Sequence, residues 1–145
     1  MKENVLVLPY IKDQNGLPFK LGGLVYERNG HFSFIFGERD NTINPLEQSK
    51  KLLLENSSYT VDDDRCLYMN SLVSLQPIGE VPLIFDIFLV DVSDLSIIDD
   101  KIVKEGVIFK FKELSTIIKM DDILVLACLI KLINLFFDNT FLIEE

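Results

Sequence analysis

Apolar and polar positions along the first third of the chain predict strands separated by turns. An apolar, β-rich run at 5–11 (VLVLPYI) is followed by the turn sequence DQNG at 13–16. Strand-like runs then fill 21–37 on either side of Asn29-Gly30, a dipeptide that favours a hairpin turn. We therefore expect one strand and then a hairpin before the first helix.

The segment after the hairpin carries the local signals of a helix. Asn44 is a favourable N-cap, and Pro45 suits the first helical position. Glu47 stands where the acid of a capping box is found. We expect this helix to run to about Asn56 and to end at the two serines that follow.

The second half of the chain predicts more strands and two helices. The expected strands are 67–75, 83–92 and 107–114, and the expected helices are 113–120 and 122–137. The stretch 93–106 is expected to be a loop. A mixed sheet packed between helices, in one domain spanning 1–145, would bury the apolar faces of these elements.

Composition narrows the function classes. With 145 residues the chain is long enough for one domain with a core, and its net charge of -9 argues against a nucleic-acid partner. Cys66 and Cys128 lack the spacing of a metal site and are expected to be reduced thiols of a cytoplasmic protein. The apolar run at 123–137 is interrupted and too short for a membrane span, so we expect a core helix.

The stretch 37–59, GERDNTINPLEQSKKLLLENSSY, resembles the signature box of the Nudix superfamily of pyrophosphohydrolases. That box is written G-x5-E-x7-R-E-U-x-E-E-x-G-U, where U is a bulky apolar residue. The positions that agree are Gly37, Leu53, Glu55 and Tyr59. The positions that differ are Ile43, Leu52 and Asn56 for glutamates, Lys51 for the arginine, and Ser58 for the glycine.

Segments outside the box extend the resemblance over nearly the whole chain. FIFG at 34–37 resembles the end of the strand before the box, and NPLEQS at 44–49 resembles the start of the helix in the box. The stretch 106–119 resembles the end of members that act on ADP-ribose. The resemblance implies an α+β fold, an α/β/α sandwich with a mixed sheet between helices.

The resemblance also implies a reaction, the hydrolysis of a nucleoside diphosphate linked to another group. Magnesium or manganese ions would bridge the pyrophosphate oxygens and acidify the attacking water. The family places metal-binding acids at the positions of Leu52, Glu55 and Asn56, which share one helix face. Only Glu55 is an acid here, so the implied metal site is degenerate.

Other acids are candidates to replace the lost ones. Glu105 lies in the loop where ADP-ribose-type members often carry a catalytic glutamate, so the resemblance makes Glu55 and Glu105 the catalytic candidates. Glu38 and Glu47 lie within the box stretch and are candidate substitute metal ligands. For each, the alternative is a solvated surface acid.

Three hypotheses follow for function. We favour a Nudix-like protein with weak or lost hydrolase activity, no required cofactor, and a nucleotide-like small molecule or a protein as its partner. The second is an active, divergent hydrolase that uses magnesium or manganese. The third is an interaction module that self-associates, for example as a homodimer, through apolar residues such as Phe136, Phe137 and Phe141. None of the three predicts a membrane or nucleic-acid partner.

Overall fold

The computed structural model describes residues 2–74 and 81–117. Its elements, in chain order, are β1 (Lys2–Lys12), β2 (Pro18–Tyr26), β3 (His31–Ser33), β4 (Ile35–Glu38), α1 (Pro45–Ser57), the 3-10 turn η1 (Asp63–Arg65), β5 (Cys66–Ser74), β6 (Leu83–Asp91), β7 (Lys101–Lys104), β8 (Val107–Glu113) and α2 (Leu114–Ile117).

The strands of the described residues form one mixed sheet of eight strands. The main order is β5-β6-β1-β2-β8-β7, with β3 paired to β2 and β4 paired to β1. β1 runs parallel to β6 and antiparallel to both β2 and β4. The predicted α+β class with a mixed sheet is therefore confirmed.

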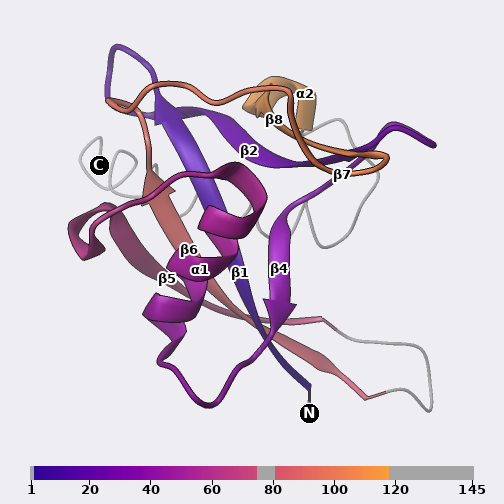
Figure 1. The fold of residues 1–145 in the computed structure, drawn as a ribbon. Coiled ribbons are helices and arrows are strands. Elements are labelled where there is room, and N and C mark those ends of the chain that lie inside the picture. The colour runs from indigo at the N-terminus through magenta and orange to yellow at the C-terminus, as the bar shows by residue number, and fades with distance from the viewer. Residues whose placement is uncertain (1, 75–80, 118–145) are drawn as a thin grey trace, which may run out of the picture.

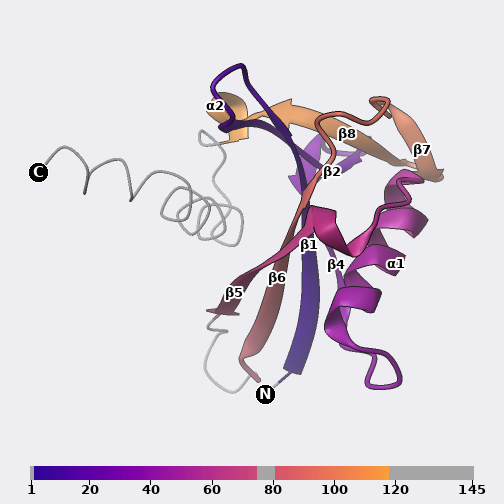
Figure 2. The same cartoon turned by 90° about the vertical axis from the view of Figure 1, so that its left-hand side faces the viewer.

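Each face of the sheet carries its own hydrophobic core. α1 covers one face, where Leu53 packs with residues such as Val7, Ile35 and Phe109. The opposite core contains Leu6 and Leu8 of β1 with side chains of β6, and α2 adds Ile117 to it. Figure 2 shows α1 and α2 on different sides of the sheet. The alternation along β1 supplies both cores, as expected for a strand covered on both faces.

The predicted hairpin is wrong in its second strand. We expected a continuous strand up to Gly37, but the structure breaks it at Phe34 into β3 and β4. β3 pairs with β2, whereas β4 leaves β2 and pairs with β1, with Gly37 opposite Val5. The break arises because the two halves have different pairing partners, β2 for β3 and β1 for β4.

The predicted loop at 93–106 is also wrong in part, because it contains β7. Lys101 and Ile102 pair with Phe109 and Ile108 of β8. The turn between these strands contains Gly106, whose φ of 77° suits glycine. β7 is a short edge strand with mixed polar and apolar residues, which gives little periodic signal.

The end of the described chain agrees with the predicted short helix, since α2 begins at Leu114. The predicted helix at 122–137, Cys128 and the phenylalanines near the C-terminus lie outside the described residues. Within 2–74 and 81–117, no helix is long and apolar enough to cross a membrane.

Candidate functional site

Helix α1 is the element around which the candidate site is built. The Asn44 side chain accepts a hydrogen bond from the Glu47 backbone N–H at 2.8 Å, so the predicted N-cap is present. Leu53 is fully buried and anchors the helix on the sheet. Figure 1 shows α1 in front of the sheet, with β4 on one side of it and β5 and β6 on the other.

The flank of α1 toward β4, which we call the box flank, carries Gln48, Leu52, Glu55 and Asn56 opposite Gly37. Leu52 packs onto Gly37, because an ideal Cβ built on this glycine would lie 3.0 Å from Leu52 Cδ2. Asn56 Nδ2 donates to the Leu52 carbonyl at 2.8 Å. Glu55 is exposed. At two of the three implied ligand positions the residue is therefore not a carboxylate: Leu52 packs against β4, and the amide nitrogen of Asn56 is bonded within the helix.

Gln48 closes the N-terminal end of the box flank. Gln48 is only 5% exposed. Its Nε2 donates to the Glu38 carbonyl at 2.7 Å. Its Oε1 accepts from the Asp40 N–H at 2.9 Å and from Arg39 Nη1 at 3.1 Å. These bonds tie the loop after β4 to the first turns of the helix.

The loop that Gln48 holds is also shaped by Asp40. The Thr42 hydroxyl and N–H donate to Asp40 Oδ1, at 2.6 and 2.9 Å, and these bonds lower the pKa of the Asp40 carboxyl. The positive charge of Lys51 contributes to the same shift. Lys51 itself is exposed at the position of the box arginine.

The C-terminal end of α1 has the backbone geometry that the box glycine would supply. Ser58 has φ 67° and ψ 6°, in the left-handed region, and its N–H donates to the Leu54 carbonyl at 2.9 Å. The Lys101 ammonium donates to Ser58 Oγ. The turn of the box helix is therefore preserved although serine replaces glycine.

The other flank of α1, toward β5 and β6, borders a pocket of about 480 Å³. We call it the pocket flank. The described residues that line it are Asn44, Pro45, Leu46, Tyr68, Asp86 and Phe88. The rings of Tyr68 and Phe88 have centroids 5.3 Å apart, and the Tyr68 hydroxyl donates to Asp86 Oδ1 at 3.1 Å. Burial and the nearby Asp86 carboxylate raise the pKa of the Tyr68 phenol.

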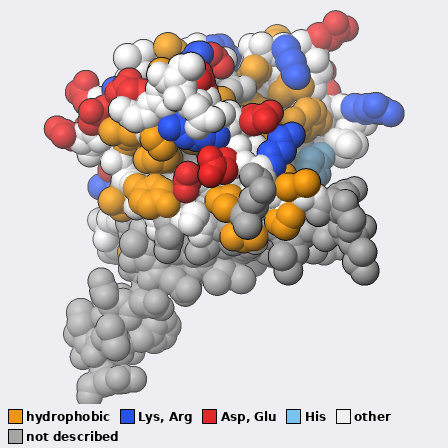
Figure 3. All heavy atoms as spheres, turned by 90° about the horizontal axis from the view of Figure 1, so that it is seen from below, with side chains coloured by type: hydrophobic (Ala, Val, Ile, Leu, Met, Phe, Trp, Pro, Cys, Tyr) orange, Lys and Arg blue, Asp and Glu red, His pale blue; other side chains and the backbone are white. Residues whose placement is uncertain are grey.

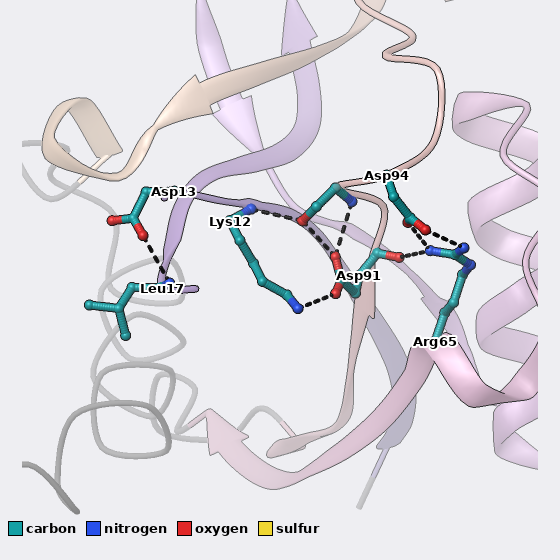
Figure 4. Close-up of polar contacts among 7 residues, drawn as sticks. Lys12, Asp13, Leu17, Arg65, Asp91 and Asp94 are labelled. Atoms are coloured by element: carbon teal, nitrogen blue, oxygen red, sulfur yellow. Dashed lines mark hydrogen bonds and ion pairs between the residues drawn. The ribbon is translucent and has the colours of Figure 1, made fainter. Parts of the chain in front are cut away.

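A polar cluster fixes the start of β5, which forms the outer wall of the pocket. Arg65 donates to the Asp91 carbonyl at 3.2 Å and to the carboxylate of Asp94, with Nη2 3.0 Å from Oδ2 (Figure 4). Lys12 Nζ lies 2.8 Å from Asp91 Oδ2, and the Ser93 hydroxyl donates to Asp91 Oδ1 at 2.6 Å. The cluster joins η1 to the ends of β1 and β6.

The charges of this cluster perturb both carboxyl groups. Burial alone would raise the pKa of Asp91, but hydrogen bonds from Lys12 and Ser93 outweigh it and hold the pKa below its usual value. The Arg65 guanidinium lowers the pKa of Asp94. Since these groups are paired with one another, we interpret the cluster as structural.

Exposed hydrophobic side chains are spread over several elements. They are Phe19, Phe36, Leu54, Leu67, Tyr68, Val73, Val81, Ile97 and Ile102. In the view from below, hydrophobic side chains lie beside both acidic and basic ones (Figure 3). Scattered exposed apolar residues are ordinary on folded proteins and do not by themselves mark an interface.

Sequence comparison finds no match, either to a protein-family model or to a curated protein. Solved structures do match. The C. elegans Ap4A hydrolase in a binary complex has a TM-score of 0.65 at 15% identity, over 96% of this chain and 99% of that one. A NUDIX hydrolase from Listeria monocytogenes, named putative, has a TM-score of 0.66 at 16% identity, over 91% and 92%. This chain has the Nudix fold.

A third similar structure is a complex with a ligand. The NUDIX domain of Shewanella oneidensis NrtR, crystallised with ADP ribose, matches with a TM-score of 0.58 at 16% identity, over 81% of this chain and 76% of that one. At these identities the likeness establishes the fold of this chain. The resemblance stated from the box is thereby confirmed as a resemblance of fold.

The candidate acids come from separate places in the fold. Glu47 is in the first turn of α1, with Oε1 3.7 Å from Lys50 Nζ. Glu38 ends β4, with Oε2 4.0 Å from Lys2 Nζ. Glu105 is exposed in the turn between β7 and β8. The catalytic roles of Glu55 and Glu105 stay predictions.

A divalent metal does not fit the donor set of the box flank. Magnesium prefers carboxylate oxygens, and here Leu52 offers no ligand atom while Asn56 offers only a neutral amide oxygen. Among residues 2–74 and 81–117, no group of three or more His, Cys, Asp or Glu side chains could hold a metal ion. The metal-ligand roles of Glu38, Glu47 and Glu55 stay predictions.

The pocket flank is the part of the site that sequence reasoning missed. Asn44 and Pro45 were predicted only as helix-start residues, and Tyr68 and Asp86 were not singled out. A signal was available, because Asp86 is the one charged residue inside the apolar run of β6, LIFDIFLV. A charged residue within a strongly apolar strand needs a polar partner, and here that partner is Tyr68.

Proposed function

We propose that this Nudix-fold protein has weak or lost pyrophosphohydrolase activity and binds a nucleotide-like ligand. The observation that carries the proposal is the packing of Leu52 on Gly37, together with the neutral amide of Asn56 in place of a second carboxylate. One exposed carboxylate, Glu55, competes poorly with water for a strongly hydrated magnesium ion. Without bridging metal ions, the charge that develops on the pyrophosphate loses most of its stabilisation.

The ligand class in this proposal is supported by the structural neighbours. One is an Ap4A hydrolase and another is a domain crystallised with ADP ribose, so nucleotide-like compounds are the first ligands to test. The net charge of -9 favours such a small molecule over a nucleic acid. A cytoplasmic location belongs to the same proposal, supported by the free, half-buried thiol of Cys66, whose burial raises its pKa.

The test restores the implied ligands and asks whether metal binding returns. In the double variant Leu52→Glu/Asn56→Glu, three carboxylates share one face of α1 and repel one another until a cation binds. We expect magnesium or manganese to stabilise this variant by about 1–3 kcal/mol at 10–100 times its Kd. The wild type should show no metal-dependent rise of the melting temperature.

Activity is measured on the same proteins with ADP-ribose and Ap4A. We expect no metal-dependent turnover by the wild type and detectable turnover by the double variant. Adding Glu55→Gln to the double variant should remove both the turnover and the metal-dependent stabilisation. Wild-type turnover that is abolished by Glu55→Gln would refute lost activity and favour the divergent hydrolase.

A further inference from the structure

The pocket flank combines an exposed aromatic face with a carboxylate. Tyr68 is 52% exposed, whereas Phe88 beneath it is 5% exposed. The two rings are tilted by 53°, so they are not stacked face to face, and about half of the Tyr68 surface stays accessible. Pro45 and Leu46, from the first turn of α1, form the facing apolar wall.

The size and lining of this pocket suit a planar heterocycle. Its volume of about 480 Å³ falls in the range of about 300–1,000 Å³ that is usual for small-molecule sites. Planar bases stack on tyrosine rings because every base has a π-face. The open half of the Tyr68 ring and the apolar wall of α1 could hold such a ring between them.

The charge in the pocket selects which end of a nucleotide enters. Asp86 is an anion, and none of the described lining residues is a cation. A phosphate would be repelled by this carboxylate, whereas an amino group could donate to it. Asp86 already accepts from Tyr68 through Oδ1, and a carboxylate has room for several donors.

We infer that this pocket binds the base of the nucleotide-like ligand, with the ring stacked on Tyr68 and an amino group donating to Asp86. The inference rests on the proposed function, since it names where that ligand is recognised. It separates base recognition on the pocket flank from the degenerate metal positions on the box flank. The ligand class is a nucleoside whose base carries an exocyclic amino group.

The first experiment uses the unmodified protein. Adenosine, cytidine and guanosine are titrated into isotope-labelled protein, and the backbone amide signals are followed by NMR. We expect the largest shifts at Leu46, Tyr68, Asp86 and Phe88, with Glu55 and Glu105 unaffected. If no nucleoside shifts the pocket signals at millimolar concentration, the inference is wrong.

Two matched variants on β5 test the stacking. Tyr68→Ala should weaken adenosine binding, measured by calorimetry, by about 5- to 150-fold. Leu67→Ala is the control, because Leu67 is equally exposed, at 50%, and faces the opposite side of the strand. It should change the Kd less than twofold. Tyr68→Phe keeps the ring and should retain most of the affinity, which separates stacking from the hydroxyl.

The contact with Asp86 is tested with a matched pair of ligands. Purine riboside lacks the 6-amino group of adenosine and should bind the wild type about tenfold more weakly, as for a lost hydrogen bond to a charged group. Asp86→Asn should weaken adenosine by a similar factor and leave purine riboside nearly unchanged. Equal weakening of both ligands would contradict the contact between Asp86 and the amino group.

The outcomes separate this inference from the proposed function. Tight binding of choline that depends on Tyr68 and Asp86, with no nucleoside binding, would assign the pocket to an organic cation and overturn the inference. Wild-type turnover of ADP-ribose that needs Glu55 would overturn lost activity, whatever the pocket binds. If Tyr68→Ala leaves nucleoside affinity unchanged, the inference is overturned and the proposed function is not.

Discussion

The two flanks of α1 share one helix but differ in how their polar positions are used. On the box flank, Leu52 and Asn56 are turned to packing and to the helix itself. On the pocket flank, Tyr68 and Asp86 remain open beside the first turn of the same helix. Both flanks share the same anchor, the buried side of α1 that carries Leu53.

The largest loss of stability is expected from a substitution at Leu53, because it would disrupt both flanks together. This side chain is fully buried under the middle of α1. Leu53→Ala leaves a cavity, and we expect it to lower the free energy of unfolding by about 2–5 kcal/mol, measured by urea denaturation.

The neighbouring residue gives the matched control for that prediction. Leu54 is 49% exposed, and Leu54→Ala should change the unfolding free energy by no more than about 0.5 kcal/mol. Equal losses for the two variants would mean that α1 is not anchored through the side that carries Leu53.

The next largest loss of stability is expected from a substitution at Gln48, which affects the box flank alone. Gln48→Ala removes the partners of the Asp40 N–H and the Glu38 carbonyl. Leaving such groups unsatisfied costs about 1–3 kcal/mol. Hydrogen exchange should show faster exchange of the Asp40 amide, with pocket-flank amides unchanged.

Lys51→Ala serves as the comparison on the same flank. Lys51 is exposed, and its removal should shift stability by no more than about 0.5 kcal/mol. A loss of protection that spreads to Tyr68 after Gln48→Ala would show that the two flanks are coupled.

The pocket flank depends on the cluster that fixes the start of β5, and that dependence should appear as a pH effect. The pKa of Asp91 is lowered from 3.8 in the folded protein. A lowered pKa stabilises the fold above that value, and the contribution is lost as the pH falls through the folded pKa. Asp91→Asn should therefore cost about 1–2 kcal/mol at pH 7 and much less at pH 3.

Melting temperatures between pH 7 and pH 3 measure this prediction. The wild type should lose more stability on acidification than Asp91→Asn, so the two curves should converge at low pH. Parallel curves would mean that Asp91 contributes through shape rather than through its charge.

Local signals account for what could be predicted from the sequence. Asn44 and Pro45 act on the turn that contains them, so the start of α1 was predictable. The strands with long apolar runs, β1 and β6, were predictable for the same reason. The break between β3 and β4 was not, because it depends on pairing with β1, which lies about thirty residues earlier in the chain.

The candidate site also has a part that was predictable from the sequence and a part that was not. The box positions Gly37, Leu52 and Glu55 follow one another along the sequence and could be compared with a known pattern. The pocket depends on Tyr68 and Asp86 meeting across two strands, 18 residues apart. A sequence indicates that Asp86 needs a partner, but the identity of the partner follows only from the register of β5 and β6.

The smallest change in stability is expected at the end of α1, where Ser58 adopts the left-handed conformation. A residue other than glycine adopts it at a cost of about 1–2 kcal/mol, part of which glycine returns through its greater freedom in the unfolded chain. Ser58→Gly, which introduces the glycine of the Nudix signature at this position, should therefore raise the unfolding free energy by about 0.5–1 kcal/mol.

Ser57→Gly distinguishes that backbone effect from a general effect of glycine. Ser57 is helical and its hydroxyl donates to the Leu53 carbonyl at 2.6 Å, so glycine there should destabilise the protein by about 1 kcal/mol. Opposite signs for the two neighbouring variants would show that the left-handed turn at the end of α1 is kept at a cost in stability. Destabilisation by both would mean that the contact from Lys101 to Ser58 Oγ outweighs the backbone strain.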